Sequence, residues 1–180
     1  MRDRIFIAEH RGGLLKKEQH IQLIKWACKC SEHVLNLFGE TLDERLKKAL
    51  LIAKEWANGN TTVGDAMKAS VGAHATAKES SNPTSTAVAR SVGQAVATAH
   101  MADHSLGAAL YALKAVKNAD KSIDTERKWQ NEQLPSEIKD IVISARKMKE
   151  NLVPPLLAEL ARGRHDTRLP NRSAKWLRDK

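Results

Sequence analysis

Histidines on apolar, helix-forming stretches are the residues of this 180-residue chain best placed to do chemistry. His100 and His104 are four residues apart in the segment TAHMADHSLGAA, and Asp103 lies between them. On a helix, side chains at this spacing have Cβ atoms about 5–6 Å apart, which is close enough to share one ion or one water. We therefore expect both imidazole rings on the same side of one helix.

Three further polar residues could join this pair if the helices that carry them meet. His74 lies among small residues in GAHAT, and His33 follows Glu32 on an earlier helix. A histidine that faces a packing surface must find a polar partner, or it loses about 1–3 kcal/mol for the unsatisfied group. We expect His33 or His74, or both, within reach of the pair. The predicted polar pocket is made of Glu32, His33, His74, His100, Asp103 and His104.

Three interpretations of this pocket stay open, of which a catalytic role without a metal is the least favoured. In the first, it is a buried network in which each ring bonds a neighbour. In the second, His74, His100 and His104 bind a divalent transition metal such as zinc or nickel, which imidazole suits. Helical bundles place metal ligands on facing helices, so the second interpretation implies a metal-dependent activity. We prefer the first, under which the chain is a binding protein and not an enzyme.

Other residues that could carry chemistry give weaker signals. Cys28 and Cys30 are two residues apart, so on a helix they point to different sides. We expect both to be free thiols and Cys30 to be buried. His10 and His20 are expected to be exposed. Residues 11–13, an arginine and two glycines, are expected to form a simple turn and not an anion cradle.

The elements that must position these residues are all helical, because apolar residues recur at spacings of three, four and seven. No region has the pattern of a sheet, so we predict an all-α fold: one bundle of about six helices. Asp43 or Thr41 can cap the second helix, and Thr62 with Asp65 can cap the third. The predicted helices cover residues 16–38, 41–57, 62–80, 84–116, 123–134 and 137–151, with a last short helix at 156–161.

The fourth predicted helix is unusually long, because its apolar residues keep phase from Val88 to Leu113. It would extend about 50 Å at 1.5 Å per residue. Residues 62–119 hold sixteen alanines and eight charged residues, so the third and fourth helices are expected to be the buried centre. Trp26 and Trp56 are expected to be largely buried, and Trp176 to be the most exposed of the four tryptophans.

Composition and charge limit the classes of function that the chain can have. The chain is 42% hydrophobic and has a net charge of +9, with seven basic and two acidic residues in 162–180. We therefore predict a helical domain over residues 1–161 and a flexible basic tail over 162–180. Aromatic residues make up 4% of the chain and offer few platforms for bases to stack on, so we do not expect nucleic-acid binding. There is no apolar run that would span a membrane or serve as a secretory signal, so we expect a cytoplasmic protein.

Four segments resemble a known family. They are RGGLLKKEQH (11–20), KWACKCSEHVLNLF (25–38), AVATAHMADHSLGAALYALKAV (95–116) and EQLPSEIKDIV (132–142). These segments resemble the immunity proteins of bacterial polymorphic toxin systems, in the branch related to immunity protein five. The resemblance covers about residues 10–145, and the segment TAHMADHSLGAA is its most distinctive part.

The resemblance implies an all-helical cytosolic protein that neutralises a toxin by binding it, with no reaction of its own. The histidine positions of the family fall here on His33, His74, His100 and His104. The partner would be the cognate toxin, and the basic charge favours an acidic face on that toxin. The resemblance identifies no metal, and association of the chain into a homodimer stays open.

Overall fold

The computed structural model describes residues 4–152. This part of the chain has seven α-helices and contains no β-strand, so the all-α prediction is confirmed. Within it, no helix is both long and apolar enough to cross a lipid bilayer. The helices are α1 (Lys17–His33), α2 (Glu44–Ala57), α3 (Val63–Glu79), α4 (Pro83–Ala97), α5 (His104–Asn118), α6 (Ile123–Glu132) and α7 (Ser136–Leu152).

Side chains at the start of several helices cap them at the positions that the sequence predicts. The side chain of Asp43 accepts the backbone N–H of Arg45 at the start of α2. At the start of α3, the side chain of Thr62 accepts the backbone N–H of Asp65 at 3.1 Å. Such caps stabilise a helix by about 0.5–2 kcal/mol each. At α4 the cap is Asn82, with Pro83 in the first turn, so this helix begins one residue before the predicted residue 84.

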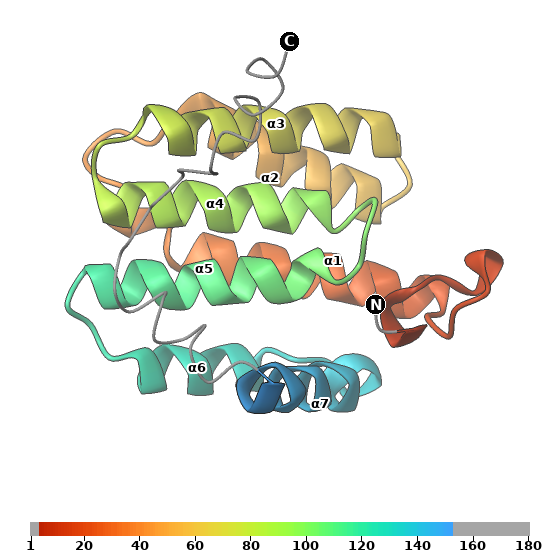
Figure 1. Cartoon of the computed structure of the whole chain (residues 1–180). Coiled ribbons are helices and arrows are strands. Elements are labelled where there is room, and N and C mark those ends of the chain that lie inside the picture. The colour runs from red at the N-terminus through yellow and green to blue at the C-terminus, as the bar shows by residue number, and fades with distance from the viewer. Residues whose placement is uncertain (1–3, 153–180) are drawn as a thin grey trace, which may run out of the picture. The chain divides into compact units, whose positions relative to one another are not determined.

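The prediction of one long helix over residues 84–116 is wrong. The chain leaves the helix after Ala97, turns through Thr98–Asp103 and starts α5 at His104, so that α4 and α5 form a hairpin (Figure 1). The apolar phase persists because both halves of the hairpin face the same core. Two helices packed on each other bury more surface than one straight helix of the same length.

The centre of the bundle is the α4–α5 pair, and the prediction that α3 shares the centre is wrong. Helix α4 packs against α5 on one side and α3 on the other, while α1 contacts both α4 and α5 (Figure 1). Ser91 of α4 is fully buried. Its hydroxyl donates to the carbonyl of Ala108 on α5 at 2.9 Å and lies 2.8 Å from the hydroxyl of Ser31 on α1.

Helix α3 packs on the outside of the bundle, against α2 and α4, and leaves one apolar face exposed to solvent. Its buried side chains are small, and they are Ala66, Ser70, Ala73, Thr76 and Ala77. Its larger apolar side chains point outward: Val63 is 40% exposed, Met67 48% and Val71 70%. The alanine content therefore marked a helix that packs closely on one face, not one that is buried all round.

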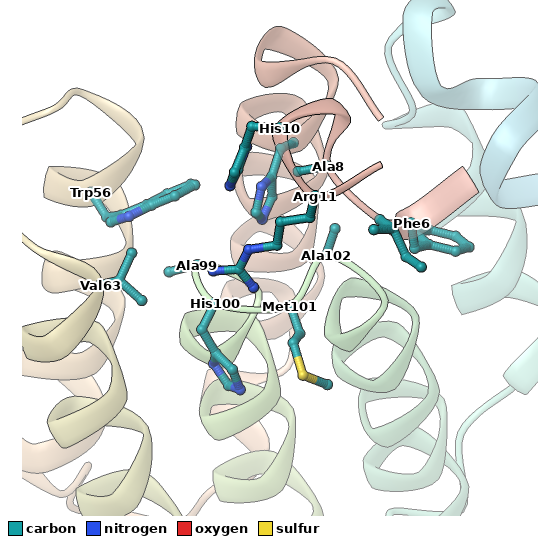
Figure 2. Close-up of a pocket in the computed structure, with 12 residues that line it drawn as sticks. Phe6, Ala8, His10, Arg11, Trp56, Val63, Ala99, His100, Met101 and Ala102 are labelled. Atoms are coloured by element: carbon teal, nitrogen blue, oxygen red, sulfur yellow. The ribbon is translucent and has the colours of Figure 1, made fainter. Parts of the chain in front are cut away.

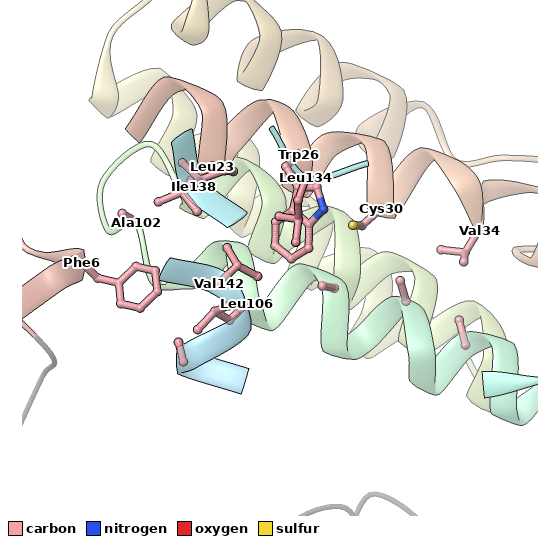
Figure 3. Close-up of a cluster of buried hydrophobic side chains, with 14 of the residues drawn as sticks. Phe6, Leu23, Trp26, Cys30, Val34, Ala102, Leu106, Leu134, Ile138 and Val142 are labelled. Atoms are coloured by element: carbon pink, nitrogen blue, oxygen red, sulfur yellow. The ribbon is translucent and has the colours of Figure 1, made fainter. Parts of the chain in front are cut away.

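A cluster of buried apolar side chains is formed mainly by α1, α4, α5 and α7 (Figure 3). Trp26 is its largest member and is 1% exposed, which confirms the prediction for this residue. The indole N–H of Trp26 donates to the carbonyl of Gln130 at 2.9 Å. Trp56 is partly buried and packs at the edge of a second cluster, so the prediction that it is largely buried is confirmed only in part. Trp176 lies outside the described residues.

The chain divides into two compact units, Met1–Arg146 and Lys147–Lys180. The division falls within α7. The predicted boundary between residues 161 and 162, the predicted basic tail and the short helix predicted at 156–161 lie outside the described residues.

At Gly93 the ring of His74 on α3 packs directly against the backbone of α4. A Cβ atom placed on Gly93 would lie 2.6 Å from Cε1 of the His74 ring, which is closer than such atoms come in proteins. Gly107 on α5 makes room in the same way for the side chain of Gln94, whose Oε1 would lie 2.8 Å from an added Cβ. These two glycines let polar side chains fit between the helices.

We predict that Gly93→Ala lowers the free energy of unfolding by about 1–3 kcal/mol, because the added methyl group displaces the His74 ring. Combining Gly93→Ala with His74→Ala should cost less than the sum of the single changes, because the clash then disappears. Gly72→Ala on α3 is the matched control, since a Cβ there meets nothing within 4 Å and alanine favours the helix. Urea unfolding of the four variants measures these effects, and additive losses would contradict the proposed contact.

Candidate functional site

The six predicted pocket residues do not form a single pocket in the structure. His33 lies at the end of α1, where its Nδ1 is 2.7 Å from Oε2 of Glu126 on α6. Its ring also stacks on Trp129, with ring centroids 3.6 Å apart. Glu32 forms an ion pair with Lys54 of α2. The polar groups of His33 and Glu32 therefore find partners on α6 and α2, and not among the other predicted residues.

The contacts of His33 belong to a polar network that holds α6 against α1. The carboxylate of Glu126 is buried and also accepts from the side-chain amide of Gln130 at 2.9 Å. The guanidinium of Arg146 donates to Gln130 Oε1 at 2.6 Å. A buried charge is tolerated when it is paired and hydrogen-bonded in this way. We assign His33 and Glu126 a structural role.

The other three histidines do gather, along one side of α4. The rings of His100 and His104 have centroids 5.0 Å apart, as the spacing predicts. Nδ1 of His104 donates to Oε1 of Gln94 at 2.6 Å, because an amide oxygen can only accept. The His74 ring lies over Gly93, and its Nδ1 accepts from the guanidinium of Arg90 at 3.1 Å.

The environment of His74 favours the neutral imidazole. Burial lowers its pKa below the usual value, and the nearby charges of Arg90 and His104 lower it further. Arg90 and Gln94, which bond His74 and His104, were not among the predicted site residues. They occupy positions on α4 that face the histidines, and sequence spacing alone could not show which neighbour each ring would meet.

The metal interpretation finds no support in this geometry. Within residues 4–152, no group of three or more His, Cys, Asp or Glu side chains is arranged to hold a metal ion. The Nδ1 atoms of His74 and His104 are already used by Arg90 and Gln94. The predicted zinc or nickel site at His74, His100 and His104 therefore has no support among the described residues.

A pocket lies next to this row of histidines, at the turn between α4 and α5. It has a volume of about 170 Å³. The apolar side chains of Trp56, Val63, Ala99 and Met101 line it together with polar ones. Figure 2 shows that it is closed from one side by the N-terminal segment. The polar and charged residues that line it are His10, Arg11, His20 and His100.

The N-terminal segment folds back on itself to form the wall of this pocket. The carbonyl of Ile7 accepts the N–H of Leu15 at 3.0 Å, and Leu15 in turn accepts from Glu9 at 3.1 Å. Gly12 has a φ of 78°, which a residue without a side chain adopts without strain. A Cβ on Gly13 would overlap the carbonyl of Ile7, so no other residue fits there. The predicted turn at residues 11–13 is confirmed, and it holds His10 and Arg11 at the pocket.

His20 connects α1 to the turn between α4 and α5. Its Nε2–H donates to the carbonyl of Thr98 at 2.6 Å, and its ring lies 5.0 Å from that of Trp56. Burial lowers the pKa of His20 despite this bond, and the nearby positive charges of Arg11 and His10 lower it further. His20 is half-buried, so the prediction that it is exposed is wrong, whereas His10 is exposed as predicted.

A signal for His20 was present in the sequence. His20, Ile24 and Ala27 follow one another at spacings of four and three, which places them on the inner face of α1. Nothing local connects His20 with Trp56 or with residues 98–102, because they come together only when α1, α2 and the α4–α5 hairpin pack. The pocket is therefore a product of the tertiary fold.

Fold and site together describe an all-α protein with a cationic pocket at one end of a central helical hairpin. Residues 13–137 match the family model described as "Imm-5 like putative immunity protein". This match covers well over half of the chain, so the chain belongs to that family. The matched region contains His20, Trp56 and His100, while His10 and Arg11 precede it. No match was found among curated proteins or among solved structures.

We predict that the protein loses stability as the pH falls below about 6.5, the usual pKa of histidine. His20 and His74 have lowered pKa values in the folded chain, so between those values and 6.5 the unfolded chain binds more protons. Each group contributes a slope of at most about 1.4 kcal/mol per pH unit. Urea unfolding between pH 7.5 and 5 measures it, and His20→Gln and His74→Gln should each flatten the profile. Profiles as steep as that of the unchanged protein would contradict these assignments.

Proposed function

We propose that this protein neutralises a bacterial toxin in the cytosol by binding it directly. Membership of the immunity-protein family is the observation that carries this proposal. The proposal needs a surface that remains available for a partner once the bundle has folded. Helix α3 offers one.

The candidate binding surface is the α3 stripe, which we define as Val63, Met67 and Val71. These residues are spaced by four and therefore lie along one face of the helix. Apolar side chains at this spacing are the usual anchors by which a helix docks against a partner. Val63 also lines the pocket, so the α3 stripe and the pocket form neighbouring parts of one surface.

The charge of the chain favours an acidic face on the toxin. The net charge is +9, and the exposed Lys68 and Lys78 lie on the same helix as the α3 stripe. Inhibitors that imitate nucleic-acid phosphates would need the opposite sign. Complementary charge around an apolar centre steers association and excludes partners of like charge.

Inhibition by binding, without covalent chemistry, also agrees with the state of the two thiols. Cys28 and Cys30 are both buried and free. Burial raises the pKa of Cys28 to about 12 and raises that of Cys30 as well. The thiolate is the reactive form of cysteine, so neither residue serves as a nucleophile at neutral pH.

We predict that the protein captures the product of an adjacent toxin gene, and that Val71→Glu or Met67→Glu weakens this binding. Placing a charge in the apolar centre of an interface costs about 2 kcal/mol or more, which is roughly a thirtyfold loss of affinity. Leu51→Glu is the matched control, because Leu51 is a 57% exposed apolar residue on α2. Titration calorimetry with the purified toxin measures the affinities, and rescue of toxin-expressing cells measures the function.

Two results would contradict the proposal. If the chain binds no product of a neighbouring toxin gene and rescues no cell, the function is wrong. If Leu51→Glu weakens binding as much as Val71→Glu, the α3 stripe is not the contact. Self-association through the α3 stripe is the competing use of this surface, and a mass that rises with concentration and falls in Val71→Glu would reveal it.

A further inference from the structure

The pocket between the N-terminal segment and the α4–α5 turn concentrates positive charge. Of the residues that line it, Arg11 carries a full positive charge and His10, His20 and His100 can each take up a proton. None of the described lining residues of this pocket is an aspartate or a glutamate. Groups of one sign in a concave site of low dielectric create a field that attracts the opposite charge.

Arg11 is the residue best placed to meet a ligand. Its guanidinium extends into the pocket between Trp56 and the loop at Ala99 and His100 (Figure 2). Among the residues that the structure describes, no carboxylate pairs with it, whereas Arg45 on α2 is bonded to both Asp43 and Glu79. A guanidinium presents a planar fork of donors that matches the two oxygens of a carboxylate or of a phosphate.

The repulsion within the pocket supports the same conclusion. The charges of Arg11 and His10 both act on His20 and disfavour its protonation. The ring of His20 is held by its hydrogen bond to the carbonyl of Thr98. The loop that carries Arg11 is tightly closed at Gly13, where there is no room for a side chain. The fold thus keeps Arg11, His10 and His20 together, and a bound anion would offset the positive potential that acts on His20.

The other residues that line the pocket indicate what the rest of the ligand is made of. Trp56, Val63, Ala99 and Met101 supply apolar surface beside the cationic groups. A volume of about 170 Å³ suits a group of a few non-hydrogen atoms, such as a carboxylate with a short apolar or aromatic body. Such pockets combine apolar walls with a few placed polar groups that orient the ligand.

We propose that this pocket is an oxyanion-binding site, in which Arg11 and His10 hold a carboxylate or phosphate group and Trp56 contacts the apolar body attached to it. The oxyanion can come from a free small molecule or from an acidic side chain of a protein partner. This site does not depend on the toxin-binding function proposed above. It can be tested on the chain alone.

Titration of the full-length protein with benzoate, followed by the histidine ring and tryptophan indole signals in NMR spectra, tests the site. We expect saturation with a dissociation constant on the order of 1 mM, given the small size of benzoate. Inorganic phosphate should perturb the signals of His10 and His20. Benzyl alcohol, which has the same ring but no charge, should give no saturable change.

Arg11→Gln should weaken benzoate binding by at least about tenfold, which is the loss expected for a charged hydrogen bond. Arg11 is exposed and has no side-chain bond within residues 4–152, so this variant should remain folded. Lys117→Gln is the matched control, because it removes one positive charge from an exposed position on α5. No saturation with either anion, or equal weakening by the two variants, would overturn the proposal.

A comparison of toxin capture separates the two sources of the oxyanion. If an acidic side chain of the toxin occupies the pocket, Arg11→Gln weakens capture and benzoate competes with the toxin. If the ligand is a free anion, Arg11→Gln captures the toxin as well as the unchanged protein does. A chain that binds benzoate but no toxin would overturn only the proposed function, and a chain that binds toxin but no anion would overturn only this inference.

Discussion

The close packing of α4 against α5 is the constraint on which the other helices depend. Ser91 is fully buried at this contact, and its hydroxyl bonds the backbone of α5 and meets Ser31 of α1, so one small side chain joins three helices. Gly93 and Gly107 let polar side chains fit beside α4. Since a larger residue at these points would force the helices apart, the small residues fix where α1, α3 and α5 can lie.

The same hairpin creates the pocket. The turn at residues 98–103 has to reverse the chain, and its backbone carbonyl at Thr98 is satisfied by His20 from α1. The N-terminal segment then closes over the turn and brings Arg11 toward it. The pocket and the α3 stripe meet at Val63, so the charged and the apolar parts of the surface lie together, which is the usual composition of a site that binds a partner or ligand with specificity.

The histidines illustrate how the need for polar partners determines the interior. His33 and His74 both lie on helices that contact the core, but His33 bonds Glu126 whereas His74 accepts from Arg90. Each ring takes the partner that packing brings nearest. The buried carboxylate of Glu126 and the partly buried ring of His74 would each lose about 1–3 kcal/mol without a partner. The result is two separate networks, one that holds α6 and one that lines α4, in place of the single cluster that the sequence predicts.

The sequence by itself determined the features that depend on neighbours within a turn or two of helix. The all-α fold, the caps at Asp43 and Thr62, the pairing of His100 with His104 and the burial of Trp26 all follow from residue types at short spacings. Only the tertiary structure decided that the helix predicted over residues 84–116 breaks at residue 98, that Trp56 stays partly exposed and that His20 joins the pocket. The apolar phase of α4 and α5 is the same whether the chain continues or folds back, so the choice rests on the surface that the packed hairpin buries.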